Sequence, residues 1–352
     1  MMNDKLTASL LLCLILLSPA LFGAPSIDEV QKNFLLDLQE QVLVHDSRES
    51  LHNLAQIKSS LTALKSAPTQ QVLDQLQADF RRFVGSWKAL EASYILGALD
   101  DNYVDHPRFI DYFHQAKESI PEQVEKALNS QKPLQKALFK YSTKSINALE
   151  YLLFAQPEQG SLLPAMGSRR IEAAEIAVAN INLWLSEIAE GYQVEEQLFA
   201  DGNTAIGLLV NGLIDSSYKL ANWRIGEAGG LTKKYAGKQS AQRLEYALSA
   251  SSYVSIEAIL QTHRKVVDRD DAVDLLALAQ IKNAETEVLF IRDQIDAALS
   301  TLATMPQPLS KQLASEQYQI LYEQLQKIHK AYYFMLIDAL SLNANIIDAD
   351  GD

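Results

Sequence analysis

The chain has 352 residues and an acidic balance, with 44 Asp and Glu against 31 Lys and Arg and a net charge of −13. An acidic surface argues against nucleic-acid binding, because proteins bind nucleic-acid phosphates through basic patches. Hydrophobic residues make up 48% of the sequence, which excludes a disordered chain and permits a sizeable core. Glycine and proline are scarce, at 14 and 10 residues, which favours long helices over a turn-rich sheet protein.

Residues 1–24 have the pattern of a signal peptide. Lys5 supplies a short positive region, and Leu6 to Leu17 is apolar but too short to span a bilayer comfortably. No second apolar stretch is long enough to span, so we expect an exported, periplasmic mature chain that does not cross a membrane. An uncleaved N-terminal anchor and association with the outer membrane stay open as alternatives.

Cys13 is the only cysteine of the chain and lies inside this apolar stretch. Lipidation is an alternative, although a lipoprotein signal would place a small residue before the cysteine and leucines precede it here. Removal of the signal peptide leaves a mature chain without cysteine, which excludes disulfides and thiolate metal sites.

The rest of the chain has the amphipathic spacing and capping residues of helices, and no segment convincingly shows the period of two that marks a strand. Helices are expected at 26–65 (two, broken near His45), 70–99, 107–119, up to 129, 133–154, 168–190, 195–222 and 310–342. A heptad seam of an antiparallel bundle is predicted by Ala277, Ile281, Ala284, Val288, Ile291, Ile295, Ala298 and Leu302. Residues 223–238 are predicted to form a basic, glycine-rich loop.

The prolines and glycines between residues 156 and 167 form the clearest break in the chain. We place a domain boundary there, with an N-terminal helical bundle at 25–160 and a C-terminal helical bundle at 161–352. The expected fold is all-α, with two halves that each resemble an up-down four-helix bundle and pack side by side with a cleft between them.

Tyr141 to Phe154 (YSTKSINALEYLLF) is predicted to be one buried helix that carries polar side chains. Asn147 and Glu150 are three residues apart, so their side chains share one face. A buried carboxylate is costly without a partner, which makes Glu150 a candidate functional residue. The alternative is a buried polar pair satisfied by a neighbouring Arg, Lys or Tyr.

This segment resembles the G-x-H-x-x-E motif of the imelysin-like family, with Ser145 in place of Gly and Asn147 in place of His. Trp87 to Tyr94 resembles a second pattern of the family, W-x-x-A-R-x-x-Y, with Glu91 in place of Arg. The C-terminal end, which finishes in D-G-D, is the third likeness. The resemblance runs over nearly the whole mature chain. It implies an exported, all-helical protein of a family associated with bacterial iron uptake and also classed as metallopeptidases.

The resemblance places a ligand pocket or a metal site at the motif. Replacing the motif His by Asn147 removes a good nitrogen ligand, and zinc-peptidase chemistry normally needs about three protein ligands. The sequence therefore does not decide between an enzyme and a binding protein, and it assigns no catalytic residue. The expected ligand-binding residues are Ser145, Asn147, Glu150, Trp87, Glu91 and Tyr94.

A second group of metal-ligand types lies between residues 101 and 114. Asp111 and His114 are three apart on an expected helix, and carboxylate with imidazole suits iron or manganese. Glu150 could join such a site, and the alternative for the whole group is a solvated loop and helix start. The candidate metal ligands are Glu150, Asp111, His114 and His106, with Asp101 and Asp105 nearby.

The last residues, 348–352, resemble the start of a calcium loop but lack its distal Glu, so a solvated tail is the alternative. Iron, zinc and calcium therefore remain the possible cofactors. Ser249, Ser251, Ser252 and Ser255 have no nearby His base in the sequence, and His263 carries no motif. Residues 226–240 lack the spacing of a phosphate loop.

Three functions remain open. The first is a periplasmic binding protein linked to iron uptake, which holds a small ligand or metal ion in the cleft near the motif. The second is a metallopeptidase with a rearranged site, in which His106 or His114 replaces the lost histidine. The third is a structural partner of another protein in the cell envelope.

Overall fold

The computed structural model describes residues 26–157, 160–194, 201–270 and 272–343. Within these ranges every regular element is a helix and none is a strand, which confirms the all-α fold. None of the helices described is long and apolar enough to cross a membrane. The expected signal peptide and the expected calcium loop both lie outside the described residues.

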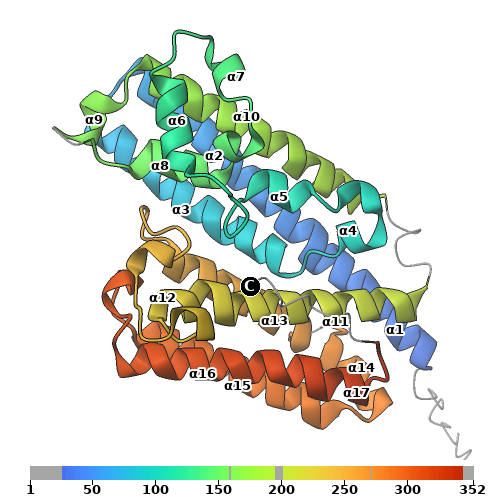
Figure 1. Cartoon of the computed structure of the whole chain (residues 1–352). Coiled ribbons are helices and arrows are strands. Elements are labelled where there is room, and N and C mark those ends of the chain that lie inside the picture. The colour runs from blue at the N-terminus through green and yellow to red at the C-terminus, as the bar shows by residue number, and fades with distance from the viewer. Residues whose placement is uncertain (1–25, 158–159, 195–200, 271, 344–352) are drawn as a thin grey trace, which may run out of the picture.

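The helices form two groups that lie side by side (Figure 1). In the first group, α2 packs against α3 and α10, and α10 packs against α5 and α8. In the second group, α15 packs against α13 and α16, and α16 packs against α11. The most extensive packing between the groups joins α3 to α13.

The first group contains α2 (His45–Ser66), α3 (Gln70–Ala92), α4 (Leu96–Leu99), α5 (His106–Ile110), α6 (Ile120–Leu128), α7 (Leu134–Ala137), α8 (Ile146–Phe154), α9 (Leu162–Ala165) and α10 (Ser168–Gly191). The second contains α11 (Gly202–Lys219), α12 (Glu227–Gly229), α13 (Ser252–Val267), α14 (Leu275–Lys282), α15 (Glu285–Thr304), α16 (Glu316–Lys330) and α17 (Ile337–Ala339). The N-terminal α1 (Ile27–Leu38) packs against α11 and α14 of the second group.

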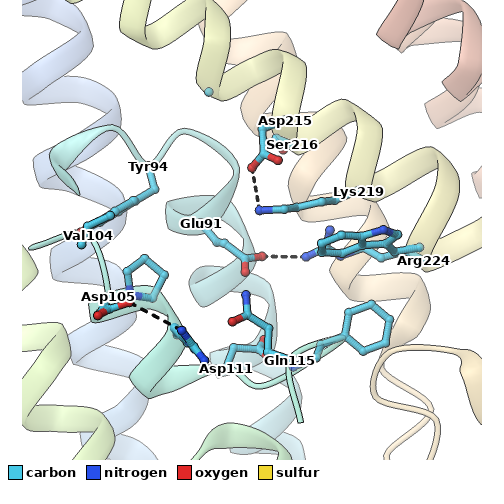
Figure 2. Close-up of a pocket in the computed structure, with 15 residues that line it drawn as sticks. Glu91, Tyr94, Val104, Asp105, Asp111, Gln115, Asp215, Ser216, Lys219 and Arg224 are labelled. Atoms are coloured by element: carbon cyan, nitrogen blue, oxygen red, sulfur yellow. Dashed lines mark hydrogen bonds and ion pairs between the residues drawn. The ribbon is translucent and has the colours of Figure 1, made fainter. Parts of the chain in front are cut away.

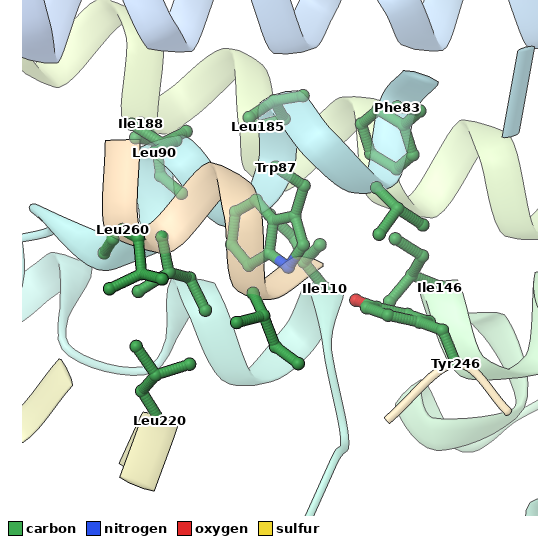
Figure 3. Packing of buried hydrophobic residues seen from close by; sticks show 14 of the residues in the cluster. Phe83, Trp87, Leu90, Ile110, Ile146, Leu185, Ile188, Leu220, Tyr246 and Leu260 are labelled. Carbon is green, nitrogen blue, oxygen red and sulfur yellow. The ribbon is translucent and has the colours of Figure 1, made fainter. Parts of the chain in front are cut away.

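Helix α3 organises the interface because it buries side chains along most of its length. Thr69 caps its N-terminus by accepting a hydrogen bond from the backbone N–H of Val72. Further along, Trp87 is fully buried among apolar side chains from both groups, including Ile146 of α8 and Leu260 of α13 (Figure 3). A helix buried on several sides places its interior polar residues inside the protein.

The structure places the change from one group to the other after α10 (Figure 1). Helices α8 and α10, which flank the boundary expected at residue 160, pack against each other. The breaks around Pro157 and Gly160 therefore lie in a connection between neighbouring helices of one group.

Several expected helices are shorter than the periodicity indicated. The segment 141–154 is a 3-10 helix at Tyr141–Lys144 followed by α8, because Ser145 is extended and caps α8 through its hydroxyl. The segment 70–99 is interrupted between α3 and α4. The heptad seam begins only at Ala284, because Asn283 adopts a left-handed conformation with φ of 57° and ends α14.

Two corrections affect the site directly. The helix expected at 107–119 ends at Ile110, so Asp111 is extended and His114 has a φ of 64°. Asp111 and His114 therefore do not share a helical face.

Conversely, the expected loop at 223–238 begins as helix, since α11 continues through a π-helical turn at Leu220–Gly226 into α12. This continuation buries Arg224.

Candidate functional site

A buried lysine lies at the centre of the interface between the two groups. Lys88 follows Phe80 and Val84 at steps of four on α3, so it points inward with them, and none of its side chain is exposed. Its Nζ lies 2.6 Å from Glu245 Oε1, 2.7 Å from Asp111 Oδ2 and 2.8 Å from Glu91 Oε2. One ammonium group therefore bridges three carboxylates from three separate segments.

Arg224 is the second cation of this group. Its Nε donates to Glu245 Oε2 and its Nη2 donates to Glu91 Oε2, both at 2.8 Å. We call Lys88, Glu91, Asp111, Arg224 and Glu245 the Lys88 cluster. Its three carboxylates outnumber its two cations, so the cluster keeps one net negative charge.

The electrostatics of the cluster hold Lys88 and Asp111 in their charged forms. Burial alone would lower the pKa of Lys88, but the carboxylates of Asp111, Glu245 and Glu91 outweigh it and raise that pKa above its ordinary value. Burial alone would raise the pKa of Asp111, but the Lys88 ammonium holds it well below its usual range.

Asp111 connects the cluster to the motif segment. Its Oδ2 also accepts hydrogen bonds from the indole Nε1 of Trp87 at 3.2 Å and from the hydroxyl of Tyr246 at 2.6 Å. Its Oδ1 accepts from the backbone N–H of Phe113 at 2.9 Å and from Nδ2 of Asn147 at 3.2 Å. Both oxygens of this buried carboxylate are fully engaged.

Asn147 uses its amide to hold the chain around Asp111 in place. Its Oδ1 accepts from the backbone N–H of Tyr112 at 2.7 Å and from the Ser145 hydroxyl at 3.3 Å. Its Nδ2 donates to Asp111. The amide therefore acts as a donor and an acceptor at once, a combination that positions a backbone turn.

Glu150 is buried, and its partner is a serine. Its Oε1 accepts from both the backbone N–H and the hydroxyl of Ser249, each at 2.8 Å. Burial, with a smaller contribution from the charges of Glu245 and Asp111, raises the pKa of Glu150 to about 7 despite these hydrogen bonds. The Arg, Lys or Tyr partner that we considered from the sequence is replaced by Ser249, one of the serines that had no assigned role.

An open cleft of about 360 Å³ lies beside the Lys88 cluster, between the two groups of helices (Figure 2). Part of the Glu91 side chain, 26%, is exposed there, while Arg224 and Asp111 also contribute to the wall. Lys219 and Asp215 of α11 face the cleft as an ion pair with 2.6 Å between Nζ and Oδ2. The remaining lining residues are Tyr94, Val104, Asp105, Pro107, Arg108, Phe113, Gln115, Gly212, Ser216 and Trp223.

A buried histidine lies behind the cleft wall at Ser216. His263 Nε2 is 3.0 Å from Ser216 Oγ, and its Nδ1 is 3.2 Å from the hydroxyl of Tyr332. Burial lowers the pKa of His263 to about 3, so the ring is neutral and carries one hydrogen. The Tyr332 hydroxyl is buried, and within the described residues its hydrogen finds an acceptor only at Nδ1, which places the ring hydrogen on Nε2. His263 therefore donates to Ser216 and does not activate it as a nucleophile.

The residues expected from the motif do come together, but most lie beneath the cleft surface. Trp87 and Asn147 bond to Asp111, Ser145 contacts Asn147, and Glu150 bonds to Ser249. Trp87 and Ser145 are fully buried. Glu91 and Tyr94 line the cleft, and the Tyr94 hydroxyl donates to the carbonyl oxygen of Tyr103 at 2.6 Å.

The candidate histidines have other partners. His106 Nε2 lies 2.7 Å from Glu187 Oε2, and its ring packs against Tyr103 and Trp184. His114 stacks on Trp223 with 4.5 Å between ring centroids, and its Nε2 lies 3.0 Å from Glu227 Oε2. Asp101 and Asp105 are exposed. Across the part of the chain that the structure describes, no three His, Cys, Asp or Glu side chains are arranged to hold a metal ion.

Sequence reasoning missed Lys88, Arg224, Glu245 and Tyr246. A signal for Lys88 was present, because it continues the apolar stripe of α3 at the spacing of Phe80 and Val84. No comparable signal marks Arg224, which the sequence placed in a loop, or Glu245, which precedes α13 in irregular chain.

Comparison with known proteins agrees with this architecture. Residues 44–331 match the imelysin family, peptidase M75, and the chain belongs to that family. An imelysin-like protein from Psychrobacter arcticum 273-4 has a similar crystal structure, with a TM-score of 0.73 and 17% identity over 92% of this chain and 98% of that one. A Parabacteroides distasonis ATCC 8503 protein, described as an iron-regulated protein A precursor, gives a TM-score of 0.69 and 13% identity over 91% and 96%. No curated protein matches the chain.

The motif residues do not fit the metal that a metallopeptidase of this class implies. Asn147 is a neutral amide whose oxygen already accepts a hydrogen bond from the backbone N–H of Tyr112. Glu150 faces Ser249, and the neighbouring carboxylates of the Lys88 cluster already share a cation. A metal site of this class needs about three convergent ligands and an open position for water, and these residues do not supply them.

Proposed function

We propose that this chain is a non-catalytic binding protein that acts in bacterial iron uptake from the periplasm, and that its ligand occupies the cleft beside the Lys88 cluster. The family membership and the iron-regulated neighbour support the link to iron. The sequence pattern at residues 1–24 supports export.

The observation that carries this proposal is the contrast between the motif and the cleft. At the motif, Asn147 and Asp111 bond to each other and to the backbone, and Asp111 also pairs with Lys88. Oε1 of Glu150 accepts two hydrogen bonds from Ser249. Asn147 and Asp111 shape the site but are not available to polarise a peptide carbonyl or activate water. The adjacent cleft is open and keeps charged groups on its surface.

The cleft wall favours a small, polar ligand that carries charges of both signs. Glu91 and Asp215 offer acceptors, while Lys219 and Arg224 offer donors, and Ser216 adds a hydroxyl hydrogen. Tyr94, Phe113 and Trp223 supply aromatic surface against which the body of a ligand can pack. A ferric chelate with carboxylate or hydroxamate groups has this chemistry and agrees with the link to iron.

The proposal is tested by measuring thermal stabilisation and calorimetric binding with ferric citrate, a ferric hydroxamate and free citrate. A ligand of the cleft should stabilise the wild type and lose affinity in Lys219→Ala and Trp223→Ala. Lys65→Ala is the matched control, because Lys65 pairs with Glu175 on the surface and does not line the cleft. Cleavage of a casein or peptide substrate by the wild type, absent in Glu150→Ala, would instead establish a peptidase.

A further inference from the structure

The environment of the Lys88 ammonium is that of a bound cation. Three carboxylate oxygens from Glu245, Asp111 and Glu91 converge on Nζ at 2.6, 2.7 and 2.8 Å. They come from the segment before α13, the segment after α5, and α3 itself. Hence two of the three ligating groups are distant in sequence, and only the folded chain brings them together.

A cation at this position is an electrostatic requirement of the fold. Asp111 and Glu245 are almost completely buried, at 5% and 2% exposure. Carboxylates buried side by side repel one another and lose their hydration, so they persist in their charged forms only around a positive charge. Carboxylate oxygen is also the ligand that hard divalent cations prefer in proteins.

We propose that Lys88 is a built-in replacement for a metal ion, whose ammonium fills a cation site formed by Glu91, Asp111 and Glu245 beside the family motif. The wild-type chain therefore neither needs nor admits a divalent metal there. Removing the ammonium exposes a latent site for a divalent cation or a small alkylammonium ion. This inference is independent of which ligand occupies the cleft.

The surroundings of the site meet the other needs of a cation site. Asp111 is oriented by Trp87, Tyr246 and Asn147, which are the kind of outer hydrogen bonds that fix a ligating carboxylate. Glu91 and Asp111 both line the open cleft, so an ion has a path from solvent to the carboxylates. The Lys88 stem occupies the space that an ion and its waters would need.

The test compares the wild type, Lys88→Ala, Lys88→Ala/Asp111→Asn and the surface control Lys65→Ala in thermal unfolding with millimolar Mn²⁺, Ca²⁺ or methylammonium. We expect no shift for the wild type or Lys65→Ala. Lys88→Ala should have a lower Tm and recover several degrees with at least one of these cations, whereas the double variant should recover nothing. A Lys88→Ala protein that responds to none of them, or that responds equally without Asp111, overturns the proposal.

A measurement on the wild type keeps the proposal testable if Lys88→Ala does not fold. A buried ammonium held by three carboxylates exchanges its hydrogens slowly, so ¹⁵N-lysine labelling should give a resolved Lys88 signal, assigned by its loss in Lys88→Arg. Excess Zn²⁺ or Ca²⁺ should leave this signal unchanged. Displacement of the signal by metal would contradict the proposal.

Discussion

Lys88 and Asp111 form a fully buried ion pair, with 2.7 Å between Nζ and Oδ2, that joins α3 to the segment held by the motif residue Asn147. Family membership alone would draw attention to Asn147 and Glu150. The geometry instead makes the Lys88–Asp111 pair the centre of the interface between the two groups of helices.

Lys88→Met should destabilise the protein by about 3–5 kcal/mol, because removing one partner of a buried ion pair leaves the other charge uncompensated. Urea denaturation of the wild type and the variant measures this difference. Adding Asp111→Asn to Lys88→Met should recover part of the loss, since the buried charge is then removed as well. Lys65→Met should change stability by less than about 0.5 kcal/mol, because its ion pair with Glu175 is on the surface. Equal stability of Lys88→Met and the wild type would contradict the account.

Glu150→Gln should remove a specific pH dependence of stability. The pKa of Glu150 is raised from 4.5 to about 7 in the folded chain, so the folded state keeps a proton that the unfolded state releases between these values. This contribution is complete below pH 4.5 and is lost as the pH rises through 7, which amounts to about 3 kcal/mol. Between pH 5 and pH 8 the wild type should therefore lose about 2.5 kcal/mol more unfolding free energy than the variant. Parallel pH curves for the two proteins would show that the pKa of Glu150 is not raised.

His263 should contribute a pH dependence of the opposite sign. Burial lowers its pKa from 6.5 to about 3, so the unfolded chain binds a proton that the folded chain refuses. Stability is therefore lost as the pH falls below 6.5, by about 2 kcal/mol between pH 6.5 and 5. The comparison of His263→Gln with the wild type isolates this slope. A histidine that titrates near 6.5 in the folded protein, followed by NMR, would contradict both the burial and the tautomer assigned to it.

Asn147→His restores the family residue but should not restore a metal site. The Lys88 ammonium still occupies the carboxylates, and the larger imidazole ring carries its donor and acceptor at positions different from those of the Asn147 amide, which perturbs the hydrogen bonds to Tyr112 and Asp111. We expect a modest loss of stability, about 1 kcal/mol for a perturbed hydrogen bond, and no bound metal by elemental analysis. Stoichiometric metal in Asn147→His alone would mean that the Lys88 ammonium does not keep a metal ion away from these carboxylates.

The helical fold and the burial of the motif segment could be predicted from the sequence because amphipathic spacing reports which face of a helix is covered. The spacing does not report which distant segment covers it. Asp111 was expected as a metal ligand and is instead the partner of Lys88, since the helix that would have aligned it with His114 ends at Ile110. Glu91 and Arg224 are 133 residues apart, so no local pattern could indicate their ion pair.

The π-helical turn at Leu220–Gly226 illustrates the same limit. The expected loop at 223–238, which this turn enters, has the glycines and basic residues of a loop, yet packing of the turn against α16 keeps the start of that segment helical and buries Arg224. Tertiary packing overrides weak local propensity in such segments. For this reason the motif could be found from the sequence, whereas Arg224, which pairs with Glu91 and Glu245 beside it, could not.

The most direct test of the account is the metal content of the purified protein, together with its thermal shift on addition of iron, zinc, manganese or calcium. We predict no stoichiometric metal and no shift from any of the four ions, because Lys88 already supplies the positive charge that the buried carboxylates require. Stoichiometric metal, with a stabilisation that Glu150→Ala abolishes, would contradict the account. It would instead support a metal site at the motif and a metallopeptidase function.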